Sequence, residues 1–313
     1  MKNILVYSDR PATAAELVSA GLLICAATGG TLRAVSVNDA DLSAFLAARG
    51  IDVLEIRTEG DPVADAAQMA AALKEAADQS GAGIILLSSG RRGKEIAGRL
   101  AQEIGAGCLT DVGRLDVAAG RITGVRYALG GATEVFQAVA TERQVLALRP
   151  GVFPMAPEGA PGAVQSLEVR LPAPRVRLRG VNAKAGDGAD IEKAEVLVIV
   201  GQGLADREEL VLAERIARGL GGEVACTKPV ATDRRWLPED RIVGLSGKAC
   251  RPSLALLLGV SGQVQFTVGI RDAGTIASIN RDDQAPVTSL SDYFLPADLK
   301  TVLPELAGKF SPP

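Results

Sequence analysis

Two turns rich in glycine and serine, in the last third of the chain, have residue types that could hold a phosphate or an electron-rich ring edge. The first is Val243-Gly-Leu-Ser-Gly-Lys248 and the second is Gly259-Val-Ser-Gly-Gln-Val-Gln-Phe266. The apolar run Leu254–Leu258 lies between them, and the second turn is expected to open a helix. Backbone amides in such turns, helped by a helix dipole, can bind anionic groups. Glycines that serve only to make turns would give the same pattern, and the residues alone favour neither interpretation.

Three further features could converge with these turns on one nucleotide-like ligand. Gly201-x-Gly203 follows an apolar run and resembles the start of a dinucleotide-binding fingerprint, although Asp206 takes the third glycine position. A tight turn between a strand and a helix is the simpler explanation of this pair. Asn280 ends a predicted strand, and ligands of open α/β sheets bind beyond the carboxyl ends of strands. Asp298 precedes a short predicted helix, where it could equally serve as the N-cap alone.

Gly90-Arg-Arg-Gly-Lys94, in the first half of the chain, superficially resembles a phosphate-binding loop in its glycine and lysine content. It lacks the Walker spacing and the Ser or Thr that should follow the lysine. We therefore interpret it as the solvated start of a helix that could dock a partner.

The composition excludes several classes of site. The 313-residue chain contains no histidine, which excludes Ser-His-Asp triads, histidine metal sites and histidine general bases. Its four cysteines are far apart, so we expect no metal or iron–sulfur site and a reducing compartment. The 34 basic and 37 acidic residues give a net charge of −3, which provides no footprint for nucleic acid. We assign no catalytic residue.

The N-terminal residues favour a cytoplasmic protein. The apolar run Ile4–Tyr7 is too short for the core of a signal peptide. We find no stretch that approaches the ~20 apolar residues of a membrane span. The sequence therefore predicts no membrane insertion.

Apolar runs that alternate with helical patterns predict an α/β fold with mostly parallel sheets. In the first half we expect strands at 4–7, 32–37 and 84–87, and helices at 12–28, from Asp61-Pro62 to about Gln79, and from about Lys94 to Ile104. The proline-rich residues 150–163 should form neither a helix nor a central strand. The polar, glycine-rich residues 182–190 should separate two domains, 1–185 and 186–313. The second domain should open with a strand at 196–200 and a helix at 207–220.

Several of these segments together resemble the electron transfer flavoprotein alpha subunit. In the last third they are Gly201–Leu204, Cys226–Pro229, Trp236–Pro238, Val243–Lys248, Gly259–Gln265, Ile276–Pro286, Ser291–Tyr293 and Ala297–Leu299. In the first half they are Ser89–Ala97, Thr110–Val112 and Leu148–Pro154. The resemblance covers nearly the whole chain.

The resemblance implies a fold, a cofactor and partners. The N-terminal domain would be a doubly wound parallel sheet that packs on a separate beta subunit. The C-terminal domain would be a Rossmann-like or flavodoxin-like α/β domain that holds FAD. The pair would carry electrons from a dehydrogenase, commonly an acyl-CoA dehydrogenase of fatty acid β-oxidation, to a quinone- or ferredoxin-linked acceptor. Such a chain is an electron carrier rather than an enzyme by itself, and bifurcating members carry a second FAD on the beta subunit.

By position, the resemblance also implies the FAD contacts. These residues are Gln202, Thr227, Lys228, Val243, Gly244, Leu245, Ser246, Ser261, Gly262, Gln263, Val264, Gln265, Phe266, Asn280, Asp298 and Leu299. The Ser246 hydroxyl would face flavin N5, and Ser261 with its neighbouring amides would help to hold the cofactor.

Four of these positions depart from the family pattern. The family usually has Arg at the positions of Gln202 and Lys228, Gln at that of Leu245 and His at that of Phe266. Because two donors near the ring are lost, we expect FAD to bind with an anionic semiquinone that is less stabilised than in typical relatives. The alternatives are a degenerate nucleotide-binding or structural subunit without redox activity and, less favoured, a nicotinamide-dependent dehydrogenase, for which no acid–base residue is evident.

Overall fold

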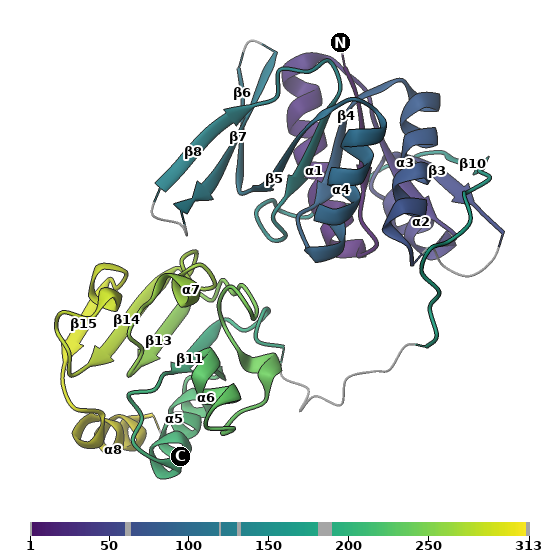
Figure 1. The fold of residues 1–313 in the computed structure, drawn as a ribbon. Coiled ribbons are helices and arrows are strands. Elements are labelled where there is room, and N and C mark those ends of the chain that lie inside the picture. Colours follow the sequence, from purple (N-terminus) through teal and green to yellow (C-terminus); the bar gives the residue numbers. More distant parts are fainter. Residues whose placement is uncertain (1, 60–63, 119, 130–132, 181–189, 311–313) are drawn as a thin grey trace. The chain divides into compact units, whose positions relative to one another are not determined.

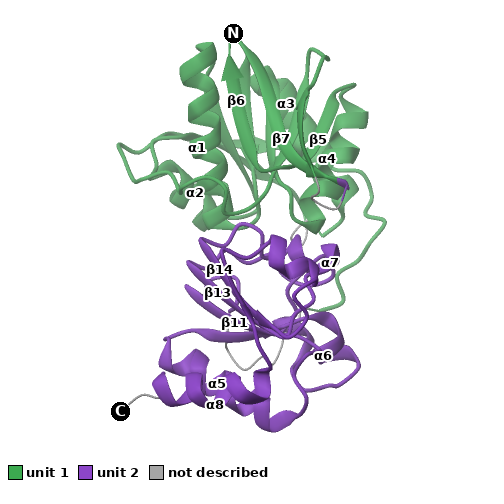
Figure 2. Ribbon diagram, turned by 90° about the vertical axis from the view of Figure 1, so that its left-hand side faces the viewer, with its two compact units in different colours: residues 1–128, 132–181 green, residues 129–131, 182–313 purple. Residues whose placement is uncertain are grey.

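The computed structural model describes residues 2–59, 64–118, 120–129, 133–180 and 190–310 (Figure 1). The chain divides into two compact units (Figure 2): unit 1 comprises residues 1–128 and 132–181, and unit 2 comprises residues 129–131 and 182–313. The predicted boundary at 185/186 lies among residues 181–189, outside the described residues. The exact division into domains therefore stays a prediction.

Unit 1 is built on a seven-stranded parallel sheet in the order β10-β3-β2-β1-β4-β9-β5. Its strands are β1 (Asn3–Tyr7), β2 (Leu32–Val37), β3 (Asp52–Arg57), β4 (Ala82–Ser88), β5 (Gly107–Val112), β9 (Gln144–Leu148) and β10 (Val164–Glu168). The direction of winding reverses between β1 and β4. This reversal confirms the predicted doubly wound sheet.

Helices cover both faces of this sheet. One apolar cluster contains residues of α1 (Pro11–Thr28) and α2 (Ala40–Ala47). The other contains residues of α3 (Ala66–Ser80) and α4 (Arg91–Glu103). Because each face is covered, the central strands are continuous apolar runs, and this pattern is what made them predictable.

Two helix starts differ from the sequence expectation. The Asp65 carboxylate caps α3 by accepting a 2.8 Å hydrogen bond from the Ala67 amide, whereas Asp61-Pro62 lies outside the described residues. The first turn of α4 begins at Arg91 rather than Lys94, because the Lys94 amide already donates to the Gly90 carbonyl oxygen at 2.9 Å. The segment expected to be a loop is thus partly helical. The interpretation of this segment as a helix start rather than a phosphate loop is confirmed.

Helix α1 is, among the described helices, the one long and apolar enough to cross a membrane by length and composition. The expectation that no stretch approaches the length of a membrane span overlooked this helix. Its Leu17, Val18 and Ile24 are buried in the core of unit 1. Core helices of this kind pass the same test of length and composition.

A three-stranded antiparallel sheet adds to unit 1 and was not predicted. It consists of β6 (Arg114–Ala118), β7 (Arg121–Ala128) and β8 (Thr133–Ala138), in that order. The described residues 150–163 form neither helix nor strand, as the four prolines predict.

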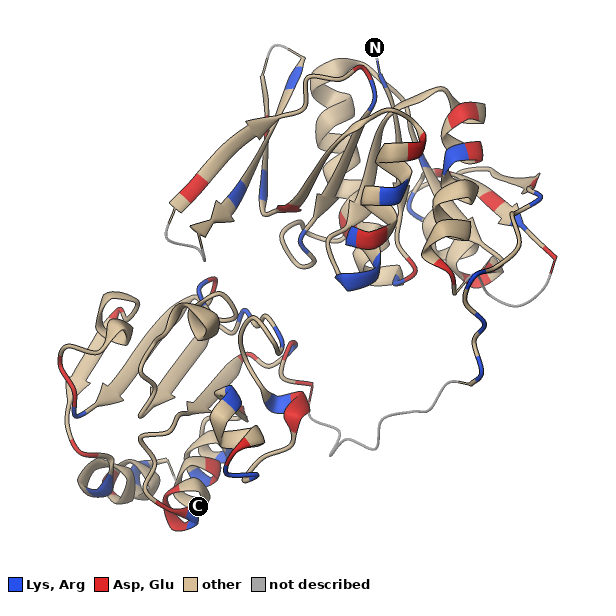
Figure 3. Ribbon diagram, in the orientation of Figure 1, with Lys and Arg blue, Asp and Glu red and all other residues tan. Residues whose placement is uncertain are grey.

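Unit 2 is built on a five-stranded parallel sheet in the order β12-β11-β13-β14-β15. Its strands are β11 (Val196–Val200), β12 (Glu223–Cys226), β13 (Leu254–Leu258), β14 (Thr275–Asn280) and β15 (Tyr293–Pro296). The order 2-1-3-4-5 is that of flavodoxin-like sheets, with the reversal between β11 and β13. Figure 3 shows β11, β13 and β14 without charged residues, as expected of strands covered on both faces.

The two faces of this sheet have different coverings. Helices α5 (Arg207–Gly219), α6 (Lys228–Thr232) and α8 (Leu299–Lys309) supply residues to one apolar cluster. The other cluster contains residues from the short α7 (Val264–Thr267) and the 3-10 turn η3 (Pro286–Ser289). A second 3-10 turn, η2 (Glu239–Arg241), follows α6.

Asp206, which takes the third glycine position of the fingerprint, is the N-cap of α5. Its carboxylate accepts a 3.0 Å hydrogen bond from the Glu209 amide, and the Glu209 carboxylate accepts a 2.7 Å hydrogen bond from the Ala205 amide. The arrangement resembles a capping box, except that Glu209 accepts from the amide before the N-cap rather than from that of the N-cap itself. The residue that breaks the fingerprint therefore has a complete structural explanation.

Candidate functional site

The sixteen predicted contact residues gather in loops at one edge of the five-stranded sheet of unit 2. Because the strands are parallel, the loops that follow them all leave from the carboxyl edge. Gln202 follows β11, Thr227 and Lys228 follow β12, residues 261–266 follow β13, Asn280 ends β14, and Asp298 with Leu299 follows β15. The Val243–Ser246 turn joins this edge through the Val243 amide, which donates to the Cys226 carbonyl oxygen at 3.0 Å.

The two fingerprint glycines pack against the loop that follows β13. The Gly201 amide donates to the Leu258 carbonyl oxygen at 2.9 Å, and the Gly203 amide donates to the Gly259 carbonyl oxygen at 2.9 Å. A Cβ atom on Gly201 would lie 2.3 Å from the Gly259 carbonyl oxygen. Packing between loops is therefore sufficient to explain the Gly-x-Gly pair, in agreement with the tight-turn interpretation. Gln202, between the glycines, is exposed.

The two glycine- and serine-rich turns contact each other. Gly244 has a φ of 131°, a backbone conformation that favours glycine, and a Cβ there would lie 2.4 Å from the Gln265 carbonyl oxygen. The next amide, that of Leu245, donates to the same carbonyl oxygen at 2.7 Å. The Leu245 side chain is left 75% exposed. The close contact between the turns was not evident from their positions in the sequence.

The helix that the second turn opens is only one turn long. The Gln263 carbonyl oxygen accepts hydrogen bonds from the amides of Phe266 and Thr267, and α7 ends at Thr267. A four-residue helix sums few peptide dipoles, so the helix-dipole contribution suggested by the sequence is small. The Ser261 carbonyl oxygen accepts a 3.0 Å hydrogen bond from the Val287 amide, which fixes the start of the turn.

Phe266 is a core residue in this structure. Its side chain is 6% exposed and belongs to the apolar cluster that also contains Val243, Val260, Ile270 and Val287. Sequence reasoning placed it beside a flavin ring because relatives have a histidine there. The structure gives the Phe266 ring a packing role, and its contact with the cofactor stays a prediction.

Asn280 and Asp298 use their side chains to position neighbouring loops. The Asn280 amide nitrogen donates to the Val260 carbonyl oxygen at 2.9 Å, and its amide oxygen accepts from the Asp282 amide at 3.1 Å. The Asp298 carboxylate caps α8 by accepting a 2.9 Å hydrogen bond from the Lys300 amide. The buried Leu299 packs in the apolar cluster under α8.

Seven of the predicted residues have polar side chains that make no hydrogen bond or ion pair to the part of the chain that the structure describes. They are Gln202, Thr227, Lys228, Ser246, Ser261, Gln263 and Gln265. All are exposed or half-buried. Each is neutral or positively charged, so the set can donate hydrogen bonds to an electron-rich ligand.

Two arginines that fix the segments around β12 were missed in the sequence. Arg241, in η2, is buried and donates to the Val224 carbonyl oxygen at 2.7 Å, with the Glu223 carboxylate 3.2 Å away. Arg234, in the turn after α6, donates to the carbonyl oxygens of Leu204 and Gln202. No pattern in the sequence could reveal either contact, because each depends on how the segments after β12 fold back in three dimensions.

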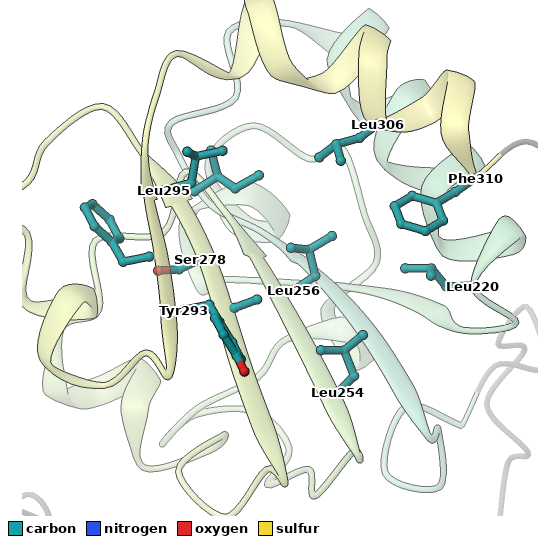
Figure 4. Close-up of a pocket in the computed structure, with 11 residues that line it drawn as sticks. Leu220, Leu254, Leu256, Ser278, Tyr293, Leu295, Leu306 and Phe310 are labelled. Atoms are coloured by element: carbon teal, nitrogen blue, oxygen red, sulfur yellow. The ribbon is translucent and has the colours of Figure 1, made fainter.

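Unit 2 also has an apolar hollow of about 330 Å³, which none of the sixteen predicted contact residues lines (Figure 4). It is lined by residues of β13, β14 and β15 together with Leu220, Leu306 and Phe310. The hydroxyls of Ser278 and Tyr293 are the polar groups of its side chains. Such a lining does not suit a phosphate or a hydrogen-bonding ring.

The basic segment of unit 1 forms ion pairs within its own unit. The Lys94 ammonium lies 2.6 Å from the Asp111 carboxylate, which also accepts a 3.1 Å hydrogen bond from the Ser89 hydroxyl. Among the described residues, no group of three or more Cys, Asp or Glu side chains is arranged to hold a metal ion.

Comparison with known proteins gives consistent matches along the chain. The model of the electron transfer flavoprotein domain matches residues 10–172, and that of the electron transfer flavoprotein FAD-binding domain matches residues 190–271. Protein FixB of Escherichia coli O127:H6 is 31% identical over 311 residues, covering 98% of this chain and 97% of FixB. FixB of Escherichia coli O157:H7 and of Shigella flexneri match to the same extent. The solved structure of spinosyn rhamnosyltransferase SpnG covers 98% of this chain and 90% of its own, but its TM-score of 0.26 and 13% identity carry no argument.

Proposed function

Because this chain belongs to the electron transfer flavoprotein family, as an alpha subunit with an FAD-binding C-terminal domain, we propose that FAD lies along the carboxyl edge of the unit 2 sheet. There the chain carries electrons from a dehydrogenase to an acceptor oxidoreductase. The seven polar side chains without partners in the described part of the chain are the observation that carries this proposal.

The chemistry of this donor set fits FAD. The cofactor has an anionic pyrophosphate, sugar-alcohol hydroxyls and a ring with carbonyl oxygens, all of which accept hydrogen bonds. The set supplies amide, hydroxyl and ammonium donors and contains no carboxylate. Asp298 is the acidic member of the predicted contacts, and its carboxylate already caps α8. When bound, FAD supplies the one- and two-electron chemistry, while the protein supplies orientation and field.

Each group of residues has a role in this proposal. Lys228 offers the positive charge, and the hydroxyls of Thr227, Ser246 and Ser261 offer donors that can rotate to suit the ligand. Gln202, Gln263 and Gln265 add amides. Val243, Gly244, Leu245, Gly262 and Val264 shape the two turns with their backbone. Phe266 and Leu299 pack in the apolar clusters under the loops, and Asn280 fixes the loop after β13 through its hydrogen bond to the Val260 carbonyl oxygen.

The proposal also covers the proteins with which this chain would interact. Electron transfer flavoprotein alpha subunits pair with a beta subunit, and we propose that residues 1–185 supply most of that contact while residues 186–313 hold FAD. The electron donor would be a dehydrogenase, with acyl-CoA dehydrogenases the leading class, and the acceptor would be quinone- or ferredoxin-linked. A cytoplasmic location is part of the same proposal. A structural subunit without redox activity is not favoured, because the matched C-terminal region is the FAD-binding domain of the family.

The test is to purify this chain with its beta subunit and count the FAD released per heterodimer from the visible spectrum. One or two FAD per heterodimer would support the proposal. A complex that stays colourless after incubation with excess FAD would overturn it.

A matched pair of variants locates the site in the same complex. Lys228→Met should weaken FAD binding by roughly tenfold, because it removes a charged donor. Lys309→Met, at the end of α8, removes the same charge from a position away from the carboxyl edge and should leave FAD binding unchanged. Equal effects of the two substitutions would place the site elsewhere.

A further inference from the structure

One side chain connects two loops of the carboxyl edge that are distant in the sequence. Arg234 lies in the turn after α6, which itself follows β12. One nitrogen of its guanidinium donates to the Leu204 carbonyl oxygen, and another donates to the Gln202 carbonyl oxygen at 3.0 Å. Both acceptors belong to the loop after β11, so the side chain reaches from one strand end to the next.

The local structure around Arg234 holds the guanidinium in place before any ligand is present. The Arg234 amide donates to the Pro229 carbonyl oxygen at 3.1 Å, and the Trp236 amide donates to the Val230 carbonyl oxygen at 3.1 Å. The guanidinium carbon lies 4.5 Å from the centroid of the Trp236 ring. A cation on an aromatic face is further stabilised, so this arginine is fixed from its own side as well as by the two carbonyls.

The loop that Arg234 contacts has most of its backbone groups directed into the protein. The amides of Gly201 and Gly203 donate to carbonyl oxygens of the β13 strand end and its loop, and the carbonyls of Gln202 and Leu204 point to Arg234. The amide and side chain of Gln202 have no acceptor or donor among the described residues. Those are the groups that this loop offers to a ligand.

We propose that Arg234 is a positioning residue of the FAD site: it fixes the Gly201–Leu204 loop in the conformation that presents Gln202 to the cofactor. This inference rests on the proposed function. It assigns Arg234 no contact with FAD. The guanidinium acts through the two carbonyl oxygens, whose lone pairs it keeps turned away from an electron-rich ligand.

The chemistry requires arginine rather than any positive charge. Two acceptors that are two residues apart need two donors in a fixed relative position, and the planar guanidinium provides them. A lysine ammonium carries its three donors on a single nitrogen at the end of a flexible stem, so it cannot reproduce the fixed spacing of two guanidinium nitrogens. Lysine at this position should therefore restore only part of the effect.

The test compares three variants of the complete complex with the beta subunit: Arg234→Gln, Arg234→Lys and Arg235→Gln. Arg235 is exposed, and its side chain makes no hydrogen bond or ion pair to the described residues, so its substitution is the matched control for charge. The measurements are the FAD dissociation constant, the midpoint potential and visible circular dichroism of the bound flavin, and the melting temperature of the FAD-free complex.

We expect Arg234→Gln to raise the FAD dissociation constant by roughly tenfold, the scale of a lost charge-assisted hydrogen bond, and to change the potential and dichroism. Arg234→Lys should recover part of each effect, and Arg235→Gln should stay within about twofold of the unmodified complex. If Arg234→Gln does not fold, Arg234→Lys against Arg235→Lys decides the question in the same way.

Two negative results have different meanings. If the unmodified complex binds FAD and the Arg234 and Arg235 variants behave alike, the role of Arg234 is overturned while the proposed function stands. If the unmodified complex binds no FAD, the proposed function fails, and this inference fails with it.

Discussion

Gly203 donates a 2.9 Å hydrogen bond from its amide to the carbonyl oxygen of Gly259, and the two residues are packed backbone to backbone. A Cβ atom on Gly203 would lie only 2.6 Å from the Gly259 Cα. This contact joins the loops after β11 and β13, at the reversal of strand order where open α/β sheets bind ligands. The middle of the candidate site is thus built on backbone atoms that leave no room for a side chain.

Gly203→Ala should therefore destabilise unit 2 and weaken FAD binding. The added methyl group must displace the backbone, and overpacking of this kind costs about 1–3 kcal/mol. Gly308→Ala is the control, because a Cβ at that position in α8 meets no atom within 4 Å. It should stabilise the protein by about 0.5–1 kcal/mol, since alanine favours helix more than glycine does. Urea unfolding measures the free energy of unfolding of both variants. Changes of the same sign in the two variants would contradict the packing argument.

Phe266→His distinguishes a core position from one that faces the cofactor. In the core, an imidazole without a partner should lower the free energy of unfolding by about 2 kcal/mol at pH 8. The loss should grow below pH 6.5, because a buried imidazole resists the charge that the unfolded state accepts freely. Phe266→Leu, which stays apolar, should cost less than about 1.5 kcal/mol. Equal stability of the two variants at pH 8 would show that the side chain faces an open site.

The buried thiols of Cys226 and Cys250 predict a loss of stability in alkaline solution. Burial raises the pKa of each thiol from 9.0 to about 12. Between these values the unfolded chain releases a proton that the folded chain retains, so rising pH favours unfolding. At pH 10 the loss should be about 1 kcal/mol per thiol.

Urea unfolding at pH 8 and pH 10 measures this loss, with Cys226→Ala as the control. The variant should show a smaller decrease than the unmodified chain, because one of the two titrating groups is gone. An equal decrease in both proteins would assign the alkaline sensitivity to other groups.

Arg241 should contribute more to stability than the carboxylate with which it pairs. Arg241→Met leaves the Val224 carbonyl oxygen without its 2.7 Å donor and the Glu223 carboxylate without its partner, and we expect a loss of about 2–3 kcal/mol. Glu223→Gln should cost less than about 1 kcal/mol, because the Glu223 side chain is 41% exposed and already hydrated. Thermal unfolding of the two variants shows which substitution lowers stability more. A larger loss for Glu223→Gln than for Arg241→Met would refute this prediction.

The strands and helices with strong local signals were predicted closely. The apolar runs Leu32–Val37 and Val196–Val200 are strands with the predicted bounds, and α1 ends where Gly29 adopts a φ of 71°. The start of α4 was wrong, because Gly93 looked like a loop residue. Its lack of a side chain instead lets the first helical turn approach Ser88, whose carbonyl oxygen would lie 1.8 Å from a Cβ.

The site was predictable wherever the position in a strand decides the location of a side chain. Asn280 was expected at the carboxyl end of its strand, which places it on that edge, whereas Lys228 was identified only through the resemblance because no strand was predicted before it. The order of the strands is a long-range property, and contacts that depend on it were missed. Arg234 reaches Gln202 only because β12 lies beside β11, and Leu245 contacts Gln265 only because two turns fold onto each other.

These contacts between loops also bear on how the protein could be altered by directed evolution. Separate strand ends suggest that each loop could be randomised by itself over an unchanged scaffold. The Gly203–Gly259 and Leu245–Gln265 contacts argue otherwise, since a new backbone path in one loop needs a compensating path in the other. A library that varies the loops after β11 and β13 jointly should yield more coloured, FAD-loaded clones than single-loop libraries of the same size.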